Sequence, residues 1–125
     1  MTAIVVCEDD ASIQGLLRAS LASMAEIHCA ADGEEGFALI MSIRPALVIT
    51  DLLMPNLDGI ALAERMRATP ALSDIPVVFI SASLSRVREI VASSARPVAL
   101  LKKPFSTNEL KMLVARHVLA TAVAV

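Results

Sequence analysis

The sequence predicts an α/β domain in which a five-stranded parallel sheet carries helices on both of its faces. Short apolar runs alternate with segments of helical periodicity along the whole chain. The composition is 56% hydrophobic but only 2% aromatic, so the core is aliphatic, as in parallel strands that are buried on both faces. Glycine and proline fall between the segments, where turns are needed. A strand followed by a helix, repeated five times, implies a parallel sheet with crossover helices.

The five predicted strands are short and differ in polarity. Four are continuous apolar runs, mostly rich in β-branched residues or leucine, at residues 3–7, 46–50, 77–80 and 98–101. Runs of this length and composition are typical of buried parallel strands. Residues 26–30 are mixed in polarity, which suits a strand at an edge of the sheet.

Five apolar stripes with i, i+3, i+4 spacing lie between and after the strands, and each is the expected buried face of a helix. The stripes are Ile13, Leu16, Leu17, Leu21 and Met24; Phe37, Ile40 and Met41; Ile60, Ala63 and Met66; Leu84, Val87, Ile90 and Val91; and Leu110, Leu113, Val114 and Val118. Residues 119–125 are apolar and lack a stop signal. They either extend the last helix or indicate that a longer chain was cut there.

Length, charge and cysteine usage narrow the class of protein. A chain of 125 residues without a linker suits one domain, over residues 1–125. The formal net charge is −2 and no basic run stands out, so nothing favours a nucleic-acid surface. The N-terminus does not resemble a signal peptide and no apolar run is long enough for a membrane span, so we expect a cytoplasmic protein. Cys7 and Cys29 fit no zinc spacing; buried free thiols are expected, with a Cys7–Cys29 disulfide as the less favoured alternative.

Acids, a hydroxyl and lysines come directly after four of the predicted strands. Glu8, Asp9 and Asp10 follow the first strand, Asp51 the third, Ser81 the fourth, and Lys102 and Lys103 the fifth. Ligands of open α/β sheets bind beyond the carboxyl ends of the strands, so these side chains are expected at one edge of the sheet. Each has a simpler explanation alone: Asp10, for example, suits the N-cap of a helix that begins near Ala11. Their joint placement favours a functional site.

The chemistry of these groups favours phosphoryl transfer. Two carboxylates about 4 Å apart repel by roughly 4 kcal/mol at an effective dielectric constant of 20, and one lysine does not neutralise three of them. A divalent cation does, and hard oxygen ligands favour Mg²⁺. A carboxylate nucleophile, a cation, a lysine and a hydroxyl together suit the formation of an acyl phosphate.

Four segments carry a resemblance to a known family: IVVCEDDASI, VITDLLMPNLDGI, PVVFISAS and LLKKPF. In this order and at these separations they resemble the receiver domain of two-component response regulators, over nearly the whole chain. The resemblance implies a flavodoxin-like, doubly wound (βα)5 fold with strand order 2-1-3-4-5. It also implies a signalling domain that is not an enzyme beyond its own phosphorylation and slow dephosphorylation.

The resemblance assigns a role to each site residue. It implies that Asp51 is the phosphoacceptor and that Lys103 and Ser81 assist the transfer. It implies Mg²⁺ as the cofactor, bound by Asp9, by Asp51, by Glu8 through water and by the backbone carbonyl of Leu53. A cis peptide is implied at Lys103–Pro104.

The resemblance also implies partners. The donor is a phosphohistidine on a sensor histidine kinase or a histidine phosphotransfer protein. Phosphorylation draws Ser81 inward and remodels the face made by the fourth helix, the fifth strand and the fifth helix, through which a target protein or a second copy of the chain binds. The predicted helices carry Arg86, Arg88, Lys111 and Arg116, expected to be exposed either as part of that surface or, by default, as solvated charges.

Two positions depart from the family pattern. Leu100 stands three positions before Lys103, where the family usually has Tyr or Phe, so a conventional aromatic flip is excluded. Pro97 stiffens the entry to the last strand, where the family often has a Gly-Ala turn. The whole protein is then either a stand-alone receiver or the front piece of a longer chain.

Other functions fit parts of the pattern less well. A degenerate receiver that binds partners without phosphorylation is favoured only by Leu100. An aspartyl-nucleophile phosphatase or hydrolase would carry its D-x-D motif after the first strand, where this chain has Glu8-Asp9-Asp10. A flavodoxin-like FMN binder would need a phosphate loop there, and three acids would repel the phosphate.

Overall fold

The computed structural model describes residues 2–83 and 85–123, with side chains described through Val118. The elements in chain order are β1 (Ala3–Cys7), α1 (Ala11–Leu21), β2 (Glu26–Ala30), α2 (Gly33–Ile43), β3 (Leu47–Asp51), α3 (Gly59–Ala68), the 3₁₀ turn η1 (Pro70–Leu72), β4 (Val77–Ser81), α4 (Val87–Ala92), β5 (Ala99–Lys102) and α5 (Thr107–Val123). Strands and helices alternate as the sequence predicts. Within these residues, no helix is long and apolar enough to cross a membrane.

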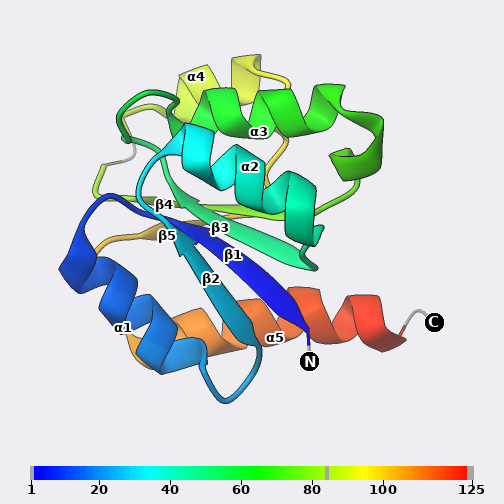
Figure 1. The fold of residues 1–125 in the computed structure, drawn as a ribbon. Helices are drawn as coiled ribbons and strands as arrows, with labels where there is room; N and C mark the ends of the chain where they lie inside the picture. The colour runs from blue at the N-terminus through cyan, green and yellow to red at the C-terminus, as the bar shows by residue number, and fades with distance from the viewer. Residues whose placement is uncertain (1, 84, 124–125) are drawn as a thin grey trace.

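The sheet is parallel throughout, with strand order β2-β1-β3-β4-β5. The predicted edge strand, β2, lies at one edge, and β5 lies at the other. Helices α1 and α5 cover one face of the sheet, and α2, α3 and α4 cover the opposite face (Figure 1). The predicted doubly wound (βα)5 fold and its strand order are therefore confirmed.

Alternate residues of each central strand enter two separate cores. Val5 of β1 packs with the α2–α3–α4 side, whereas Ile4 and Val6 pack with the α1–α5 side. This follows from the two-residue period of a strand, which sends successive side chains to opposite faces. The apolar runs of β1, β3 and β4 are continuous because both faces of these strands are buried.

Three strands end one residue later than predicted. The pairing of Asp51 with Ile80 extends β3, and the pairing of Ser81 with Lys102 extends β4 and β5. The prediction stopped each strand at its last apolar or small residue. The ladder is made by backbone groups, however, so it continues through a polar side chain. Asp51 and Ser81 are thus the last residues of their strands rather than the first residues of loops.

Several residues predicted for buried stripes are exposed. Leu16 and Met41 are 47% and 42% exposed, and Val91 is 79% exposed. Their helices present a wider apolar arc than the sheet can cover, so the residues at its margin meet solvent. Helix α4 is also shorter than its stripe suggests, at six residues from Val87 to Ala92. Leu84, at the start of that stripe, lies outside the described residues.

Both cysteines are free thiols, which confirms that reading over the alternative of a disulfide. Cys7 is fully buried in β1, and burial raises the pKa of its thiol to about 12. Cys29 was predicted to be buried as well, but it is only partly covered. It lies on β2, which has a neighbouring strand on one side only.

The side chain of Arg67, near the end of α3, binds backbone carbonyls of two segments of the chain. Its guanidinium donates hydrogen bonds to the carbonyl oxygens of Ser73 (3.0 Å), Ile75 (2.8 Å), Ala95 (2.9 Å) and Arg96 (3.4 Å). It therefore connects α3 to the segment before β4 and to the loop between α4 and β5. Burial lowers the pKa of this guanidinium, but it stays charged.

We expect Arg67→Met to lower the free energy of unfolding by about 2 kcal/mol, because several partly buried carbonyls lose their donor together. Arg65→Met is the matched control. Arg65 makes an exposed ion pair with Glu34 at 3.1 Å and lies over the ring of Phe37. Its loss should cost less than about 1 kcal/mol. Urea denaturation measures both values, and equal losses would contradict the role given to Arg67.

Candidate functional site

The predicted site residues lie together at the carboxyl edge of the sheet. Glu8 and Asp9 follow β1 directly, and Asp51 and Ser81 are the last residues of β3 and β4. Lys103 follows the last residue of β5. Because the strands are parallel and adjacent, their ends meet at one edge, as predicted from the sequence.

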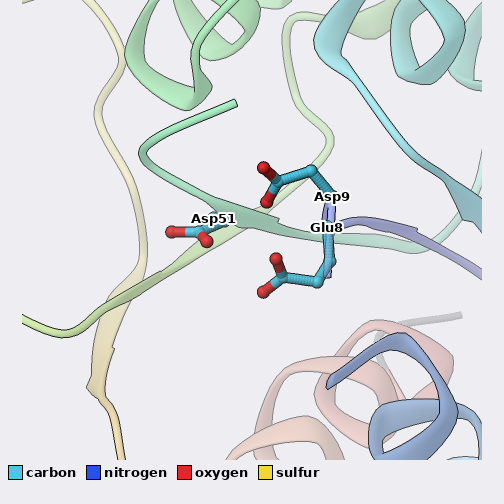
Figure 2. Close-up of side chains that lie close together, drawn as sticks. All are labelled: Glu8, Asp9 and Asp51. Carbon is cyan, nitrogen blue, oxygen red and sulfur yellow. The ribbon is translucent and has the colours of Figure 1, made fainter. Parts of the chain in front are cut away.

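Three carboxylates converge at the centre of this edge. One oxygen from each of Glu8, Asp9 and Asp51 lies within 4.8 Å of the other two. Figure 2 shows the side chains of Glu8 and Asp9 extending from the end of β1 toward Asp51. Glu8 is buried, Asp51 is partly buried and Asp9 is exposed. The cluster therefore has one open side, which faces solvent at Asp9.

Lys103 joins two of these carboxylates. Its Nζ atom donates hydrogen bonds to Glu8 Oε1 and to Asp51 Oδ2, each at 2.9 Å. Burial opposes the charge of Lys103, but its bonds to Asp51 and Glu8 outweigh burial and raise the pKa of the ammonium above its ordinary value. The lysine is therefore a fixed positive charge beside Asp51.

Glu8 occupies the most buried place in the cluster, with its side chain only 1% exposed. Burial raises the pKa of Glu8, while hydrogen bonds from Lys103 and from the backbone N–H of Asp10, at 3.1 Å, oppose the rise. Asp10 itself caps α1 by accepting from the N–H groups of Ser12 and Ile13, which confirms its predicted role as an N-cap.

The donor set suits a hard divalent cation. The cluster offers three carboxylates, and Lys103 is bonded to two of them. Mg²⁺ prefers this kind of ligand and usually keeps several waters, which the open side at Asp9 allows. Leu53, whose carbonyl is a predicted ligand, lies two residues after Asp51 and lines a pocket next to it.

Ser81 lines this pocket, which has a volume of about 150 Å³ and also borders Asp51 and Lys103. Its hydroxyl is engaged by its own loop: Ser81 Oγ donates to the carbonyl of Ser83 at 2.6 Å and accepts from the N–H of Ser83 at 3.2 Å. The hydroxyl therefore has to leave Ser83 before it can serve a group bound at Asp51.

Two residues near the site were not assigned there from the sequence. Gln14 on α1 donates from Nε2 to the backbone carbonyl of Glu8 at 2.6 Å and to that of Ala30 at 3.2 Å, which fixes the turn that carries the acids. Arg86 was expected on the exposed face of the fourth helix, but its side chain is only 21% exposed and lines the pocket beside Asp51. The i,i+3 spacing of Arg86 and Glu89 in the sequence could have indicated that the two side chains form an ion pair.

Two further features belong to the backbone around the site. The Lys103–Pro104 peptide bond is cis, as predicted. The backbone of β3 at Asp51 is in close contact with Gly59, the first residue of α3, and leaves no room for a side chain there.

The model for the response regulator receiver domain matches residues 4–115 of the chain. The chain belongs to this family. Among curated relatives, the response regulator MprA of Mycolicibacterium vanbaalenii is 34% identical over 108 residues, which cover 86% of this chain and 46% of MprA. The probable transcriptional regulator ycf27 of Porphyridium aerugineum is 33% identical over 109 residues, covering 86% of this chain and 44% of that protein. This receiver domain thus spans less than half the length of these relatives.

Solved structures show the same fold. The receiver domain of the Francisella response regulator 1452 is 28% identical, with a TM-score of 0.86 over 97% of this chain and 99% of that one. The receiver domain of the sensor histidine kinase PA1611 from Pseudomonas aeruginosa, described with a magnesium ion coordinated in its active site cleft, is 23% identical, with a TM-score of 0.86 over 94% and 97%. The flavodoxin-like class predicted from the sequence is therefore confirmed.

Membership defines the general function. Receiver domains are phosphorylation-accepting switches of two-component systems, and they bind Mg²⁺ at an acidic pocket. They interact with histidine kinases or phosphotransfer proteins.

Proposed function

We propose that residues 1–125 form a single receiver domain in which Asp51 accepts a phosphoryl group from the phosphohistidine of a sensor histidine kinase or a histidine phosphotransfer protein. The observation that supports this most is the position of Lys103, with Nζ at 2.9 Å from both Glu8 and Asp51. Asp9 lies within 4.8 Å of the same two carboxylates. A carboxylate held beside a lysine and two further acids suits a reaction that depends on positioning and charge neutralisation.

In the proposed reaction, a carboxylate oxygen of Asp51 forms a bond to phosphorus as the N–P bond of the phosphohistidine breaks. The leaving imidazole nitrogen keeps the electron pair of that bond and takes up a proton from solvent. Lys103 stays beside Asp51 and balances charge on the transferred group. Ser81 gives up its bond to the carbonyl of Ser83 and donates its hydroxyl proton to a phosphoryl oxygen.

The metal ligands in this proposal are Asp9, Asp51, the carbonyl of Leu53 and, through water, Glu8. The all-oxygen donor set and the open side at Asp9 support the assignment. The magnesium described in the PA1611 receiver domain is consistent with it. Bound Mg²⁺ would supply charge neutralisation for the phosphoryl oxygens.

The surface made by α4, β5 and α5 is proposed to bind the downstream protein partner. An apolar groove of about 310 Å³ lies between α4 and β5, and the exposed side chains Val91, Val98 and Leu100 line it. Exposed apolar groups gathered in this way favour binding of a protein partner, which is either a target or a second copy of the chain. The net charge of −2 favours neither nucleic acid nor an acidic membrane surface, and a cytoplasmic location is part of the proposal.

We expect the protein to gain one phosphoryl group when it is incubated with Mg²⁺ and acetyl phosphate. Asp51→Asn should reduce the labelling to background, because the amide is not a nucleophile toward phosphorus. Intact mass measures the adduct, which should be stable in acid and labile in base, and EDTA should suppress its formation. Asp74→Asn, at an exposed aspartate in the segment before β4, is the matched control and should label like the wild type.

Labelling that survives Asp51→Asn would refute the assignment of the phosphoacceptor. Absence of labelling in the wild type, from small donors and from histidine kinases alike, would favour a module that binds partners without phosphorylation.

A further inference from the structure

A second cation lies at the pocket beside Asp51. Arg86 immediately precedes α4, and its side chain lines the pocket of about 150 Å³ that Asp51, Ser81 and Lys103 also line. This volume is several times the roughly 30 Å³ that a water molecule occupies in the liquid, so a phosphoryl group has room in it. Lys103 and Arg86 therefore both border the space next to the phosphoacceptor.

Arg86 now connects the starts of two helices. Its Nε and Nη2 atoms donate to the carboxylate of Glu89 at 2.8 and 2.7 Å, and Nη2 also reaches Asp58 Oδ2 at 3.4 Å. Asp58 is the N-cap of α3, where its other oxygen accepts from Ala61 N–H at 2.8 Å. Arg86 thus joins the loop after Asp51 to the loop after Ser81.

The three contacts of Arg86 differ in strength. The pair with Glu89 is bidentate and short, which is the strong geometry for a guanidinium and a carboxylate. The contact with Asp58 is long, and a charged hydrogen bond at 3.4 Å is weak. Among the described residues no acceptor is bonded to Nη1, so part of the donor fork is available as well. The side chain can keep Glu89 and still bind a new anion.

The charges around Asp51 call for another cation after phosphorylation. Before it, Lys103 and the proposed Mg²⁺ would together balance the charge of the three carboxylates. The acyl phosphate replaces the single charge of Asp51 with a charge of roughly −2, so one further negative charge appears in the pocket. Arg86 is the other cationic side chain among the described residues that line it.

We propose that Arg86 is the second phosphoryl-binding cation of this receiver domain: when Asp51 is phosphorylated, its guanidinium leaves Asp58, keeps Glu89 and binds a phosphoryl oxygen. The proposal rests on Asp51 being the phosphoacceptor. It gives the phosphorylated state a direct link to the start of α4, which borders the proposed output face. No aromatic side chain is needed at Leu100 for this link.

The test uses beryllofluoride with Mg²⁺, which forms a tetrahedral mimic of the acyl phosphate on the phosphoacceptor. Arg86→Gln is expected to weaken the apparent affinity about tenfold, the effect of losing a charged hydrogen bond. Arg86→Lys keeps the charge but loses the two-pronged guanidinium, so its affinity should fall between those of the wild type and Arg86→Gln. Arg88→Gln is the matched control, because Arg88 is exposed on α4, two residues after Arg86, and the loss of charge is equal.

A second variant separates phosphoryl binding from a purely structural bridge. Asp58→Asn breaks the same connection between loops, and asparagine still caps a helix well. If Arg86 only joins the loops, Asp58→Asn should weaken beryllofluoride binding as much as Arg86→Gln does. If Arg86 binds the phosphoryl group, Asp58→Asn should leave the affinity unchanged or raise it, since a competing carboxylate is gone.

A direct signature comes from the side-chain Nε–H resonances of arginine in NMR spectra. Beryllofluoride should shift the Nε–H signal of Arg86 and leave that of Arg88 in place. Equal affinities for Arg86→Gln and Arg88→Gln, or an unmoved Arg86 signal, would overturn this proposal alone if binding still depends on Asp51. If beryllofluoride binds Asp51→Asn as well as the wild type, or does not bind the wild type, the proposed function is overturned and this proposal with it.

Discussion

Replacing Gly59 with alanine is expected to lower the free energy of unfolding by about 3 kcal/mol and to abolish labelling at Asp51. A β-carbon at this position would overlap the backbone carbonyl oxygen of Asp51 and lie 3.0 Å from the Cα of Leu52. Backbone atoms of a central strand cannot move aside as the end of a flexible side chain can, so the start of α3 must shift instead. That shift displaces the backbone that carries the phosphoacceptor.

Gly15→Ala is the matched control for this prediction. Gly15 lies within α1, and a β-carbon there meets no atom within 4 Å. The substitution should raise stability by about 0.5–1 kcal/mol, since alanine loses less conformational entropy than glycine in a helix. Urea denaturation of both variants, followed by acetyl phosphate labelling, measures the effects. A stable and fully labelled Gly59→Ala variant would show that the contact at Asp51 is not needed.

Replacing Lys103 with methionine is expected to lower the free energy of unfolding by about 3 kcal/mol in EDTA at neutral pH. The side chain of Glu8 is 1% exposed, and Lys103 is its cationic hydrogen-bond partner. Removing one member of a buried pair leaves the other charge uncompensated, which costs more than the pair contributes as a whole. Asp51, which also loses Lys103, adds repulsion to the same cluster.

The loss of stability caused by Lys103→Met should depend on pH in a defined direction. Without the bond and charge of Lys103, both of which lower it, the pKa of Glu8 rises further above its unfolded value of 4.5. An acid with a raised folded pKa binds its proton more tightly in the folded state, so stability falls as pH rises from about 4.5 to the raised pKa. The deficit of Lys103→Met relative to the wild type should therefore be smaller near pH 5 than near pH 8.

Lys102→Met is the control, because Lys102 is exposed and precedes Lys103 directly. It should change stability by less than about 0.5 kcal/mol at either pH. Denaturation curves in EDTA at the two pH values measure the difference. Similar losses for the two lysines, or a loss for Lys103→Met that ignores pH, would contradict the electrostatic account of Glu8.

The sheet could be predicted from the sequence because strands that are buried on both faces appear as continuous apolar runs. The central strands need apolar residues at every position, so runs such as residues 3–7 stand out from the helical segments. The convergence of Glu8, Asp51 and Lys103 followed from the same runs, since parallel strands end at one edge. Three predicted strands ended one residue early, because the backbone ladder continues through a polar side chain. Two of them, β3 and β5, also begin one residue later than predicted.

The place of Arg86 could not be predicted in the same way. Its position depends on where α4 begins, and no repeating pattern of residue types marks that start. The apolar stripe from Leu84 to Val91 indicated a longer helix, which would have turned Arg86 to solvent. The hydrogen bonds of Ser81 to its own loop likewise depend on local backbone geometry that residue types alone do not encode.

Helix α4 is fastened unequally at its two ends. After its last residue, the carbonyls of Ala95 and Arg96 accept hydrogen bonds from the guanidinium of Arg67. The same guanidinium also donates to the segment before β4. Before its first residue, the hydrogen bond to α3 among the described residues is the long contact between Arg86 and Asp58. We therefore expect the resistance to local opening to rise from the start of α4 toward Ala95. The segment after α4 is thus held more firmly than the start of the helix at the pocket of Asp51, and we expect movement of the helix to begin at that start.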